Sequence, residues 1–202
     1  MTEPVFILAS KSAIRATLLR NAGLTIALEA ARIDERSVEG PWVAAGMPPD
    51  TVARSLAIEK ARDVATRHPG DLVIGADQTL AVGQDRLSKV TDREAAIAQI
   101  RRLAGRTHAL HSGFAVVRDG VVLASGVSTA LMAMRPLDDR AIAAYVDAAG
   151  EAILGSVGCY QLESVGVRLF ERIEGDYFTV LGLPLLALLG ALRDQKLLGG
   201  SW

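Results

Sequence analysis

Short, uninterrupted apolar runs alternate with helical patterns along this chain, and that alternation restricts its fold more than any other feature. Residues 5–9 and 72–74 are apolar throughout, as is typical of strands that are buried on both faces of a sheet. Two longer apolar stretches, 108–117 and 121–134, meet at Asp119-Gly120, a dipeptide that favours a tight hairpin. Strand–helix–strand units give parallel pairs and a hairpin gives an antiparallel pair. The sequence therefore predicts an α/β protein with a mixed sheet.

The same patterns predict the approximate limits of each element. Ser10 is a natural N-cap for a first helix, and Pro184 suits the first turn of the last one. The region 34–49 is polar and contains proline and glycine. No repeat or linker divides the 202 residues, so we expect one domain over residues 1–202. Strands are further expected at 72–77 and 167–173, an extended stretch at 24–33, and helices at 50–67, 92–103 and 138–148.

The charge balance disfavours a nucleic-acid polymer as partner. The chain has 22 Lys and Arg against 23 Asp and Glu, a formal net charge of −1. Proteins bind the phosphate backbone of a nucleic acid non-specifically through a surplus of positive charge, and this chain lacks such a surplus. A local cluster of cations could still bind a small anion.

Cysteine content and hydropathy exclude further classes. Cys159 is the only cysteine, which rules out an internal disulfide or a multi-cysteine zinc site. It is either a small buried residue, the more common case, or a nucleophile. The N-terminal stretch lacks a basic segment, and no run reaches the roughly 18 apolar residues of a membrane span. These features predict a cytoplasmic protein without a membrane partner.

Ser10, Ser12 and Arg15 form the first candidate site. They follow the apolar run 5–9 and open a helix, whose free N–H groups and dipole attract anions. Ser12 and Arg15 share a helix face, so the arginine can close over a bound anion. The alternative is plain N-capping by Ser10 with a solvated Arg15.

Lys60 and Asp77 are two more candidates. Lys60 lies on one helical ridge with Val52, Leu56 and Val64, so it needs either an anionic partner or a path to solvent. Asp77 follows Gly75-Ala76 at the expected end of a strand, where open α/β sheets bind ligands. For Lys60 the alternative is a side chain that reaches solvent, and for Asp77 it is a side chain that caps a turn. Lys89, taken alone, is typical of a solvated charge.

Taken together, these segments resemble a known family. The opening 8–15 resembles the first motif of the Maf family of nucleoside triphosphate pyrophosphatases, and the resemblance extends to about residue 193. The order and spacing of the motifs make the resemblance specific, although each motif alone is weak. The other matching segments are 33–35, 56–61, 73–78, 88–89, 155–163, 173–177 and 182–184.

The resemblance implies a fold, an activity and residue roles. The implied fold is an elongated mixed sheet with flanking helices and two lobes around a cleft, similar to inosine-triphosphate pyrophosphatases. Asp77 matches the general base, and Glu35, Lys60 and Lys89 match the other polar residues of the cleft. Ser10, Ser12 and Arg15 match the phosphate-holding start of the first helix. A divalent cation, Mg²⁺ or Mn²⁺, is implied, and Glu35 and Asp77 are its expected ligands.

Three positions bear on the base that is accepted. Gln78 and Glu163 resemble the branch that acts on 7-methyl-GTP, and a carboxylate can accept hydrogen bonds from guanine N1–H and its amine. That branch has an aromatic residue where Ile14 stands, and an aliphatic side chain cannot stack in that way. The chain also departs from the family at Ala13 and Val90, where Pro is usual.

The resulting expectation is a hydrolase that converts a nucleoside triphosphate, preferably a purine, to the monophosphate and pyrophosphate. The second hypothesis is a nucleotide-binding regulator of cell division without turnover, because the family is associated with inhibition of septum formation. Family members are often homodimers. Trp42, Trp202 and the leucine-rich last helix could supply an interface, although core packing explains the leucines equally well.

Overall fold

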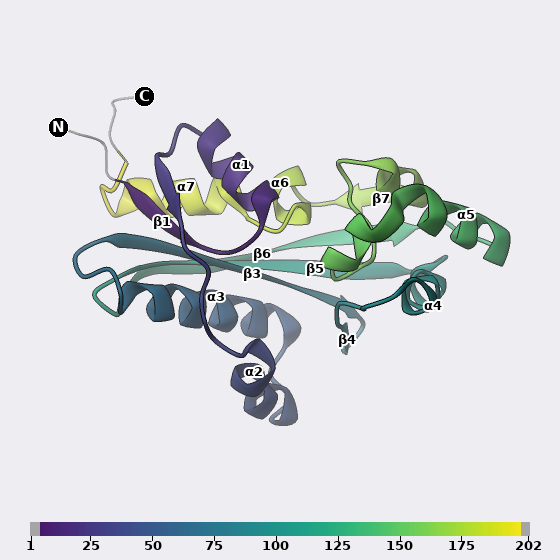
Figure 1. Cartoon of the computed structure of the whole chain (residues 1–202), viewed down its shortest axis with the longest axis horizontal. Coiled ribbons are helices and arrows are strands. Elements are labelled where there is room, and N and C mark those ends of the chain that lie inside the picture. The colour runs from purple at the N-terminus through teal and green to yellow at the C-terminus, as the bar shows by residue number, and fades with distance from the viewer. Residues whose placement is uncertain (1–4, 199–202) are drawn as a thin grey trace.

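The computed structural model of the chain describes residues 5–198, so Trp202 and most of the N-terminal stretch lie outside the described residues. One mixed sheet with strand order β2-β1-β3-β5-β6-β7 runs along the long axis, with β4 paired to β3 (Figure 1). The strands are β1 Phe6–Ala9, β2 Ile26–Leu28, β3 Leu72–Val82, β4 Asp85–Leu87, β5 Thr107–Arg118, β6 Val121–Met134 and β7 Phe170–Glu174. The helices are α1 Ala13–Asn21, α2 Glu35–Ala44, α3 Pro49–Ala65, α4 Arg93–Leu103, α5 Asp139–Ala149, α6 Tyr177–Val180 and α7 Leu185–Asp194, with 3-10 turns at Gly150–Gly155 and Val165–Leu169.

The pairing confirms the predicted mixed sheet. β1 is parallel to β2 and β3, whereas β3, β5, β6 and β7 pair antiparallel. The β5–β6 hairpin turns at Asp119 and Gly120, which have φ values of 50° and 77°. Both angles lie in the left-handed region that Asp-Gly tolerates, so the predicted hairpin is confirmed.

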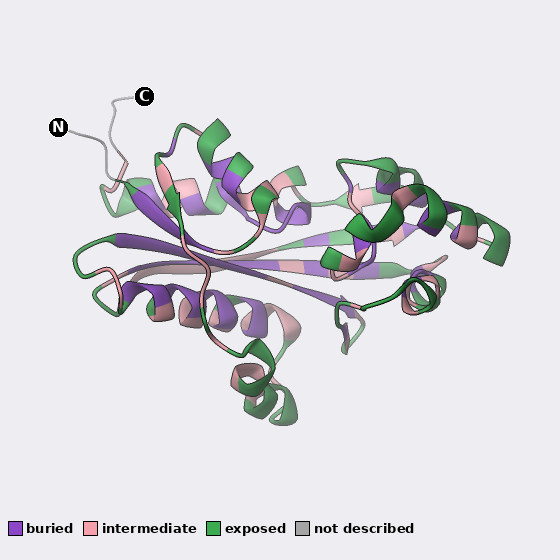
Figure 2. Cartoon of the chain, viewed as in Figure 1, coloured by how far each residue is buried: buried purple, intermediate pink, exposed green. Residues whose placement is uncertain are grey.

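Helices cover both faces of the sheet (Figure 1). Leu8 and Ile74 pack with Leu19 of α1 and Leu188 of α7 on one face, and Val73 packs with Ala57 of α3 on the other. A third apolar cluster joins α4 and α5 to the far ends of β5 and β6. The long strands β3, β5 and β6 therefore connect two ends of the molecule with separate cores (Figure 2).

Two glycines allow α3 to lie directly on the sheet. A Cβ added at Gly75 would lie 2.0 Å from the Ala57 carbonyl oxygen, and one at Gly113 would lie 2.5 Å from that of Ala53. Gly75 and Asp77 point to the same face of β3 because side chains alternate along a strand. The close approach of α3 therefore determines how near Lys60 comes to Asp77.

The structure corrects several predicted boundaries. Asp77 is not at the end of a strand, because β3 continues to Val82 through pairing with β4 and β5. The cap of α1 is Ser12, whose side chain accepts from the Arg15 N–H, and not Ser10, because residues 10–12 are still non-helical. The stretch 24–33 contains a strand only at 26–28, and residues 165–169 form a 3-10 turn before β7. Region 34–49 contains α2, which the sequence did not single out.

Within residues 5–198, no helix has both the length and the apolar character that a membrane span needs. In α7, Leu185, Leu188 and Leu192 are buried within the chain itself, whereas Leu186 is 61% exposed. Core packing thus accounts for three of the leucines that the sequence offered as an interface.

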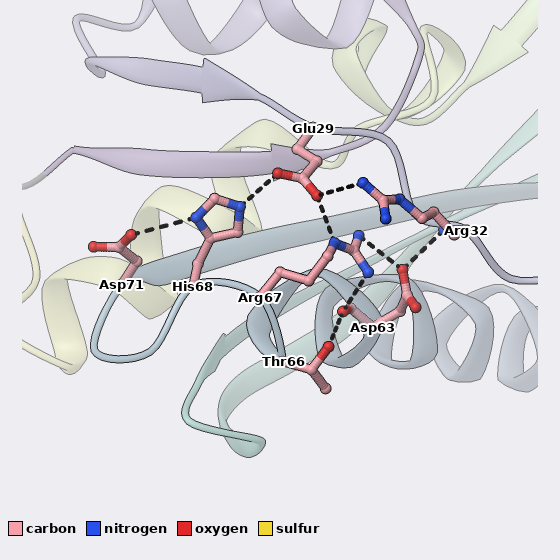
Figure 3. Close-up of polar contacts among 7 residues, drawn as sticks. All are labelled: Glu29, Arg32, Asp63, Thr66, Arg67, His68 and Asp71. Carbon is pink, nitrogen blue, oxygen red and sulfur yellow. Dashed lines mark hydrogen bonds and ion pairs between the residues drawn. The ribbon is translucent and has the colours of Figure 1, made fainter.

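A polar cluster ties the segment after β2 to the end of α3 (Figure 3). Glu29 accepts from Arg67 Nε at 2.6 Å and lies 2.5 Å from His68 Nε2. Hydrogen bonding to His68 and then to Arg67 lowers the pKa of the Glu29 carboxyl to about 2. The contribution of this carboxylate to stability is therefore present above the unfolded pKa of about 4.3 and is lost as the pH falls toward 2.

Glu29→Gln is accordingly expected to be less stable than the wild type at pH 6, and the difference should shrink below about pH 4.3. Urea unfolding at several pH values measures it. A difference that stays constant down to pH 3 would show that the carboxylate is not held in its charged form.

Candidate active site

A cleft of about 1040 Å³ opens where β1 ends and β3 continues. β1 stops opposite Gly75 and β4 pairs with β3 only from Leu80, so in the described part of the chain residues 76–79 have no strand on this side. The sheet edge is therefore open to a ligand. All ten residues singled out in the sequence line this cleft: Ser10, Ser12, Ile14, Arg15, Glu35, Lys60, Asp77, Gln78, Lys89 and Glu163.

Lys60 bridges two carboxylates that line the cleft. Its Nζ lies 2.5 Å from Asp77 Oδ1 and 2.9 Å from Glu35 Oε1. The side chains of Lys60 and Asp77 are each 10% exposed, whereas Glu35 is 54% exposed. Lys60 thus has an anionic partner, as one of the two sequence readings required, and the pair is shielded from water.

Burial sets the protonation behaviour of Asp77. Loss of solvation raises the pKa of its carboxyl, while the charges of Lys60 and Arg15 act to lower it. Its Oδ2 atom has no hydrogen-bond partner within residues 5–198. A carboxylate with a raised pKa and a free oxygen is suited to accept a proton near neutral pH.

The sequence suggested that Arg15 closes over the cleft with Ser12. In the structure Arg15 does not do so. Its Nε donates to Gly182 O at 2.7 Å, and its Nη1 donates to Ala76 O at 2.9 Å and Ser10 Oγ at 3.1 Å. The unpaired edge of β3 supplies one of these carbonyls, which explains why the guanidinium turns inward. Arg15 thus links the start of α1, the residue before Asp77 and the turn between α6 and α7.

The start of α1 retains the features of an anion site. The Ser12 N–H donates to Ser10 Oγ, so the two serines form one turn before the helix. N–H groups in the first turn of a helix lack partners within it, and the dipole adds a positive potential there. This helix end faces the same cleft as Lys60 and Lys89.

Gln78 has a fixed orientation. Its Nε2 donates to Ser112 Oγ at 3.0 Å and to the carbonyls of Thr179 and Val180 at 3.1 Å. Its Oε1 is left without a hydrogen-bond partner in the described chain and can only accept. Ser112 is thus a supporting residue that sequence reasoning missed, because nothing local marks it.

Arg86 and Glu39 also line the cleft and were not singled out. Arg86 Nη2 lies 2.7 Å from Glu39 Oε2, which links β4 to α2. The position of Arg86, just before Ser88-Lys89, was the only available signal. Lys89 and Glu163 are exposed residues of the cleft wall.

Cys159 is buried, and burial raises the pKa of its thiol to about 11. A thiol in this environment stays protonated and unreactive at neutral pH. Of the two readings, the small buried residue is therefore the one that the structure supports.

Comparison with known proteins decides the family. The sequence profile described as Maf-like protein matches residues 5–195. The chain belongs to the Maf family. A nucleoside triphosphate pyrophosphatase of Rhodopseudomonas palustris (strain HaA2) is 53% identical over 95% of this Maf chain and 94% of its own length. The 7-methyl-GTP pyrophosphatases of Brucella abortus biovar 1 (strain 9-941) and Rhizobium johnstonii are 48% and 50% identical, covering 96% and 98% of this chain and 98% and 99% of theirs.

Among solved structures, a nucleoside-triphosphatase (dITP/XTP pyrophosphatase) from Mycobacterium abscessus aligns with 95% of this Maf chain and 97% of its own. The TM-score is 0.44 and the identity 16%, a similarity too low to bear on this site.

Proposed function

We propose that this Maf chain is a hydrolase that converts a nucleoside triphosphate to the monophosphate and pyrophosphate. The observation that carries the proposal is the Asp77–Lys60–Glu35 cluster, which shares one cleft with the start of α1 and Lys89. Relatives about 50% identical over almost the whole chain are named as pyrophosphatases of nucleoside triphosphates or of 7-methyl-GTP.

Each residue has a role that its surroundings support. Asp77 acts as the general base for the attacking water. Lys60 and Lys89 neutralise the charge that develops on the phosphates and on departing pyrophosphate. Ser10, Ser12 and the first turn of α1 hold the phosphates. Arg15 fixes the backbone at Ala76 and Gly182, and its positive charge lies at the same cleft.

The carboxylates suit a divalent cation. Within residues 5–198, no group of three or more His, Cys, Asp and Glu side chains forms a ready metal cage. Mg²⁺ and Mn²⁺ are bound by oxygen ligands, and Mg²⁺ usually takes one or two carboxylates plus substrate phosphates, which matches Glu35 and Asp77. Such an ion would lower the pKa of a bound water and screen the phosphates.

The side chains proposed to face the base favour a purine. Gln78 offers only an oxygen acceptor, and Glu163 adds a carboxylate to the same cleft. Two acceptors are complementary to a base edge that carries N–H donors, as guanine does at N1 and its amine. Ile14 supplies an apolar contact without π-stacking.

Glu163→Gln is expected to lower kcat/KM for GTP or 7-methyl-GTP about tenfold, because a charged acceptor is lost. Pyrimidine triphosphates should change less. Glu171→Gln, an exposed glutamate of β7, is the matched control and should keep the wild-type ranking. An unchanged ranking in Glu163→Gln would remove this residue from base recognition.

A panel of nucleoside triphosphates with Mg²⁺, scored by pyrophosphate release, tests the proposed function. We expect release from purine triphosphates at the highest kcat/KM. Nucleotide binding without release from any member of the panel would instead favour the regulator of cell division.

A further inference from the structure

The segment 29–35 connects β2 to α2 and forms one wall of the cleft. Residues 30, 31 and 33–35 line the cleft, and Glu35 ends the segment at Lys60. None of the ten residues of α2, all of which the structure describes, is buried. Apolar packing of α2 therefore does little to determine where Glu35 lies, and the Arg86–Glu39 ion pair is what links this helix to β4.

Polar contacts to α3 hold this segment instead (Figure 3). The Arg32 N–H donates to Asp63 Oδ2 at 2.8 Å, and Arg67 Nη2 donates to the same oxygen at 3.0 Å. Arg67 Nε also donates to Glu29 Oε1 at 2.6 Å. Arg67 thus joins Asp63, which accepts from the Arg32 N–H, to Glu29, the first residue of the segment.

The spacing aligns these contacts with the active cleft. Lys60 and Asp63 are three residues apart on α3 and so lie on one side of the helix. Arg32 and Glu35 are likewise three residues apart on the segment 29–35. The Arg32–Asp63 hydrogen bond and the Glu35–Lys60 ion pair are consequently successive contacts between the same two elements.

The cluster is better shielded than an ordinary surface pair. The side chains of Asp63, Arg67 and Glu29 are 23%, 24% and 26% exposed, against 48% and 36% for the Arg62–Glu59 pair on the same helix. Burial acts to raise the pKa of Asp63, but hydrogen bonds from Arg67 and the Arg32 N–H leave it lowered. Asp63 is therefore a charged acceptor for a main-chain N–H, and hydrogen bonds to a charged acceptor are stronger than those between neutral groups.

We propose that Asp63, supported by Arg67 and Glu29, is a positioning residue that holds segment 29–35 on α3 and so places Glu35 at Lys60. The inference rests on the proposed function in one respect, the use of Glu35 in the reaction. The attachment of the segment itself can be measured without any substrate.

Hydrogen exchange measures the attachment. In Asp63→Ala, the amides of residues 29–35 should exchange several-fold faster, because the Arg32 N–H loses its acceptor. Asp63→Asn keeps a side-chain oxygen and should restore most of the protection. Glu59→Gln, on the same helix, should exchange at the wild-type rate, and wild-type exchange in Asp63→Ala would overturn the proposal.

Kinetics measure the consequence for the reaction. Asp63→Ala should lower kcat about tenfold with KM changed less than about twofold, since misplacement of an active-site group acts mainly on the transition state. In the Glu35→Gln background the same change should cost less than about twofold, because the residue to be positioned is already altered. An equal loss in both backgrounds would overturn the proposal.

Two further results separate this inference from the proposed function. If the wild type releases no pyrophosphate, the proposed function fails and exchange alone decides the attachment. If Glu35→Gln turns over like the wild type, Glu35 has no role to be positioned for and the inference is overturned. Should Asp63→Ala not fold, Glu29→Gln should show the same changes to a smaller extent, and wild-type exchange and turnover there would contradict the proposal.

Discussion

Asp77→Asn is expected to lower kcat for the preferred triphosphate by about 10²–10⁴-fold, the range typical of the loss of a general base. Asparagine has nearly the same shape but cannot accept a proton from water. Lys60 keeps Glu35 at 2.9 Å, so the lysine is not left unpaired and the fold should survive. Steady-state pyrophosphate release by the purified variant measures the loss.

Asp71→Asn is the matched control for this substitution. Asp71 precedes β3, and its side chain is 57% exposed with only a 3.7 Å contact to His68. It should retain wild-type turnover. Near wild-type turnover in Asp77→Asn, with circular dichroism and urea unfolding also unchanged, would contradict the assignment of Asp77 as the base.

Gly75→Ala is expected to lower the stability of the protein more than the addition of a methyl group anywhere else in the sheet. The added Cβ would lie 2.0 Å from the Ala57 carbonyl oxygen and 2.9 Å from the Ala61 Cβ. Backbone cannot rotate away as a side chain does, so α3 must shift, and overpacking of this kind costs about 1–3 kcal/mol or more. Because α3 carries Lys60, turnover should fall as well.

Gly40→Ala is the control, because nothing lies within 4 Å of a Cβ at that position in α2. It should be as stable as the wild type or slightly more stable, since alanine favours a helix. Urea unfolding of both variants tests the pair. Equal stability of Gly75→Ala and the wild type would show that α3 does not lie as close to β3 as described.

Local patterns were sufficient to predict much of the architecture. The apolar ridge of Val52, Leu56 and Val64 predicted α3 and placed Lys60 on its core-facing side, because helical periodicity depends only on neighbouring residues. The Asp119-Gly120 turn likewise identified the β5–β6 hairpin.

The features that were missed depend on distant residues. β3 passes Asp77 because β4 and β5 pair with it, and no local signal in Gly75-Ala76-Asp77 reveals those partners. Arg15 turns inward because the Ala76 and Gly182 carbonyls lie nearby, although Gly182 is 167 residues away.

The residues of the site were predicted more fully than the contacts between them. Motif resemblance identified ten side chains that line one cleft, but it could not reveal that Lys60 joins Glu35 to Asp77. It also gave no indication of Ser112, which accepts from Gln78, of Arg86, which pairs with Glu39, or of Asp63, which accepts from the Arg32 N–H. The roles of the ten residues stay predictions until the variants above are measured.

We propose that this cleft hydrolyses a nucleoside triphosphate and releases pyrophosphate in one step. Product analysis by chromatography, with the wild-type protein, Mg²⁺ and GTP or 7-methyl-GTP, tests it most directly. We expect one nucleoside monophosphate and one pyrophosphate for each triphosphate consumed. A nucleoside diphosphate with orthophosphate, or triphosphate that stays intact while bound, would contradict it.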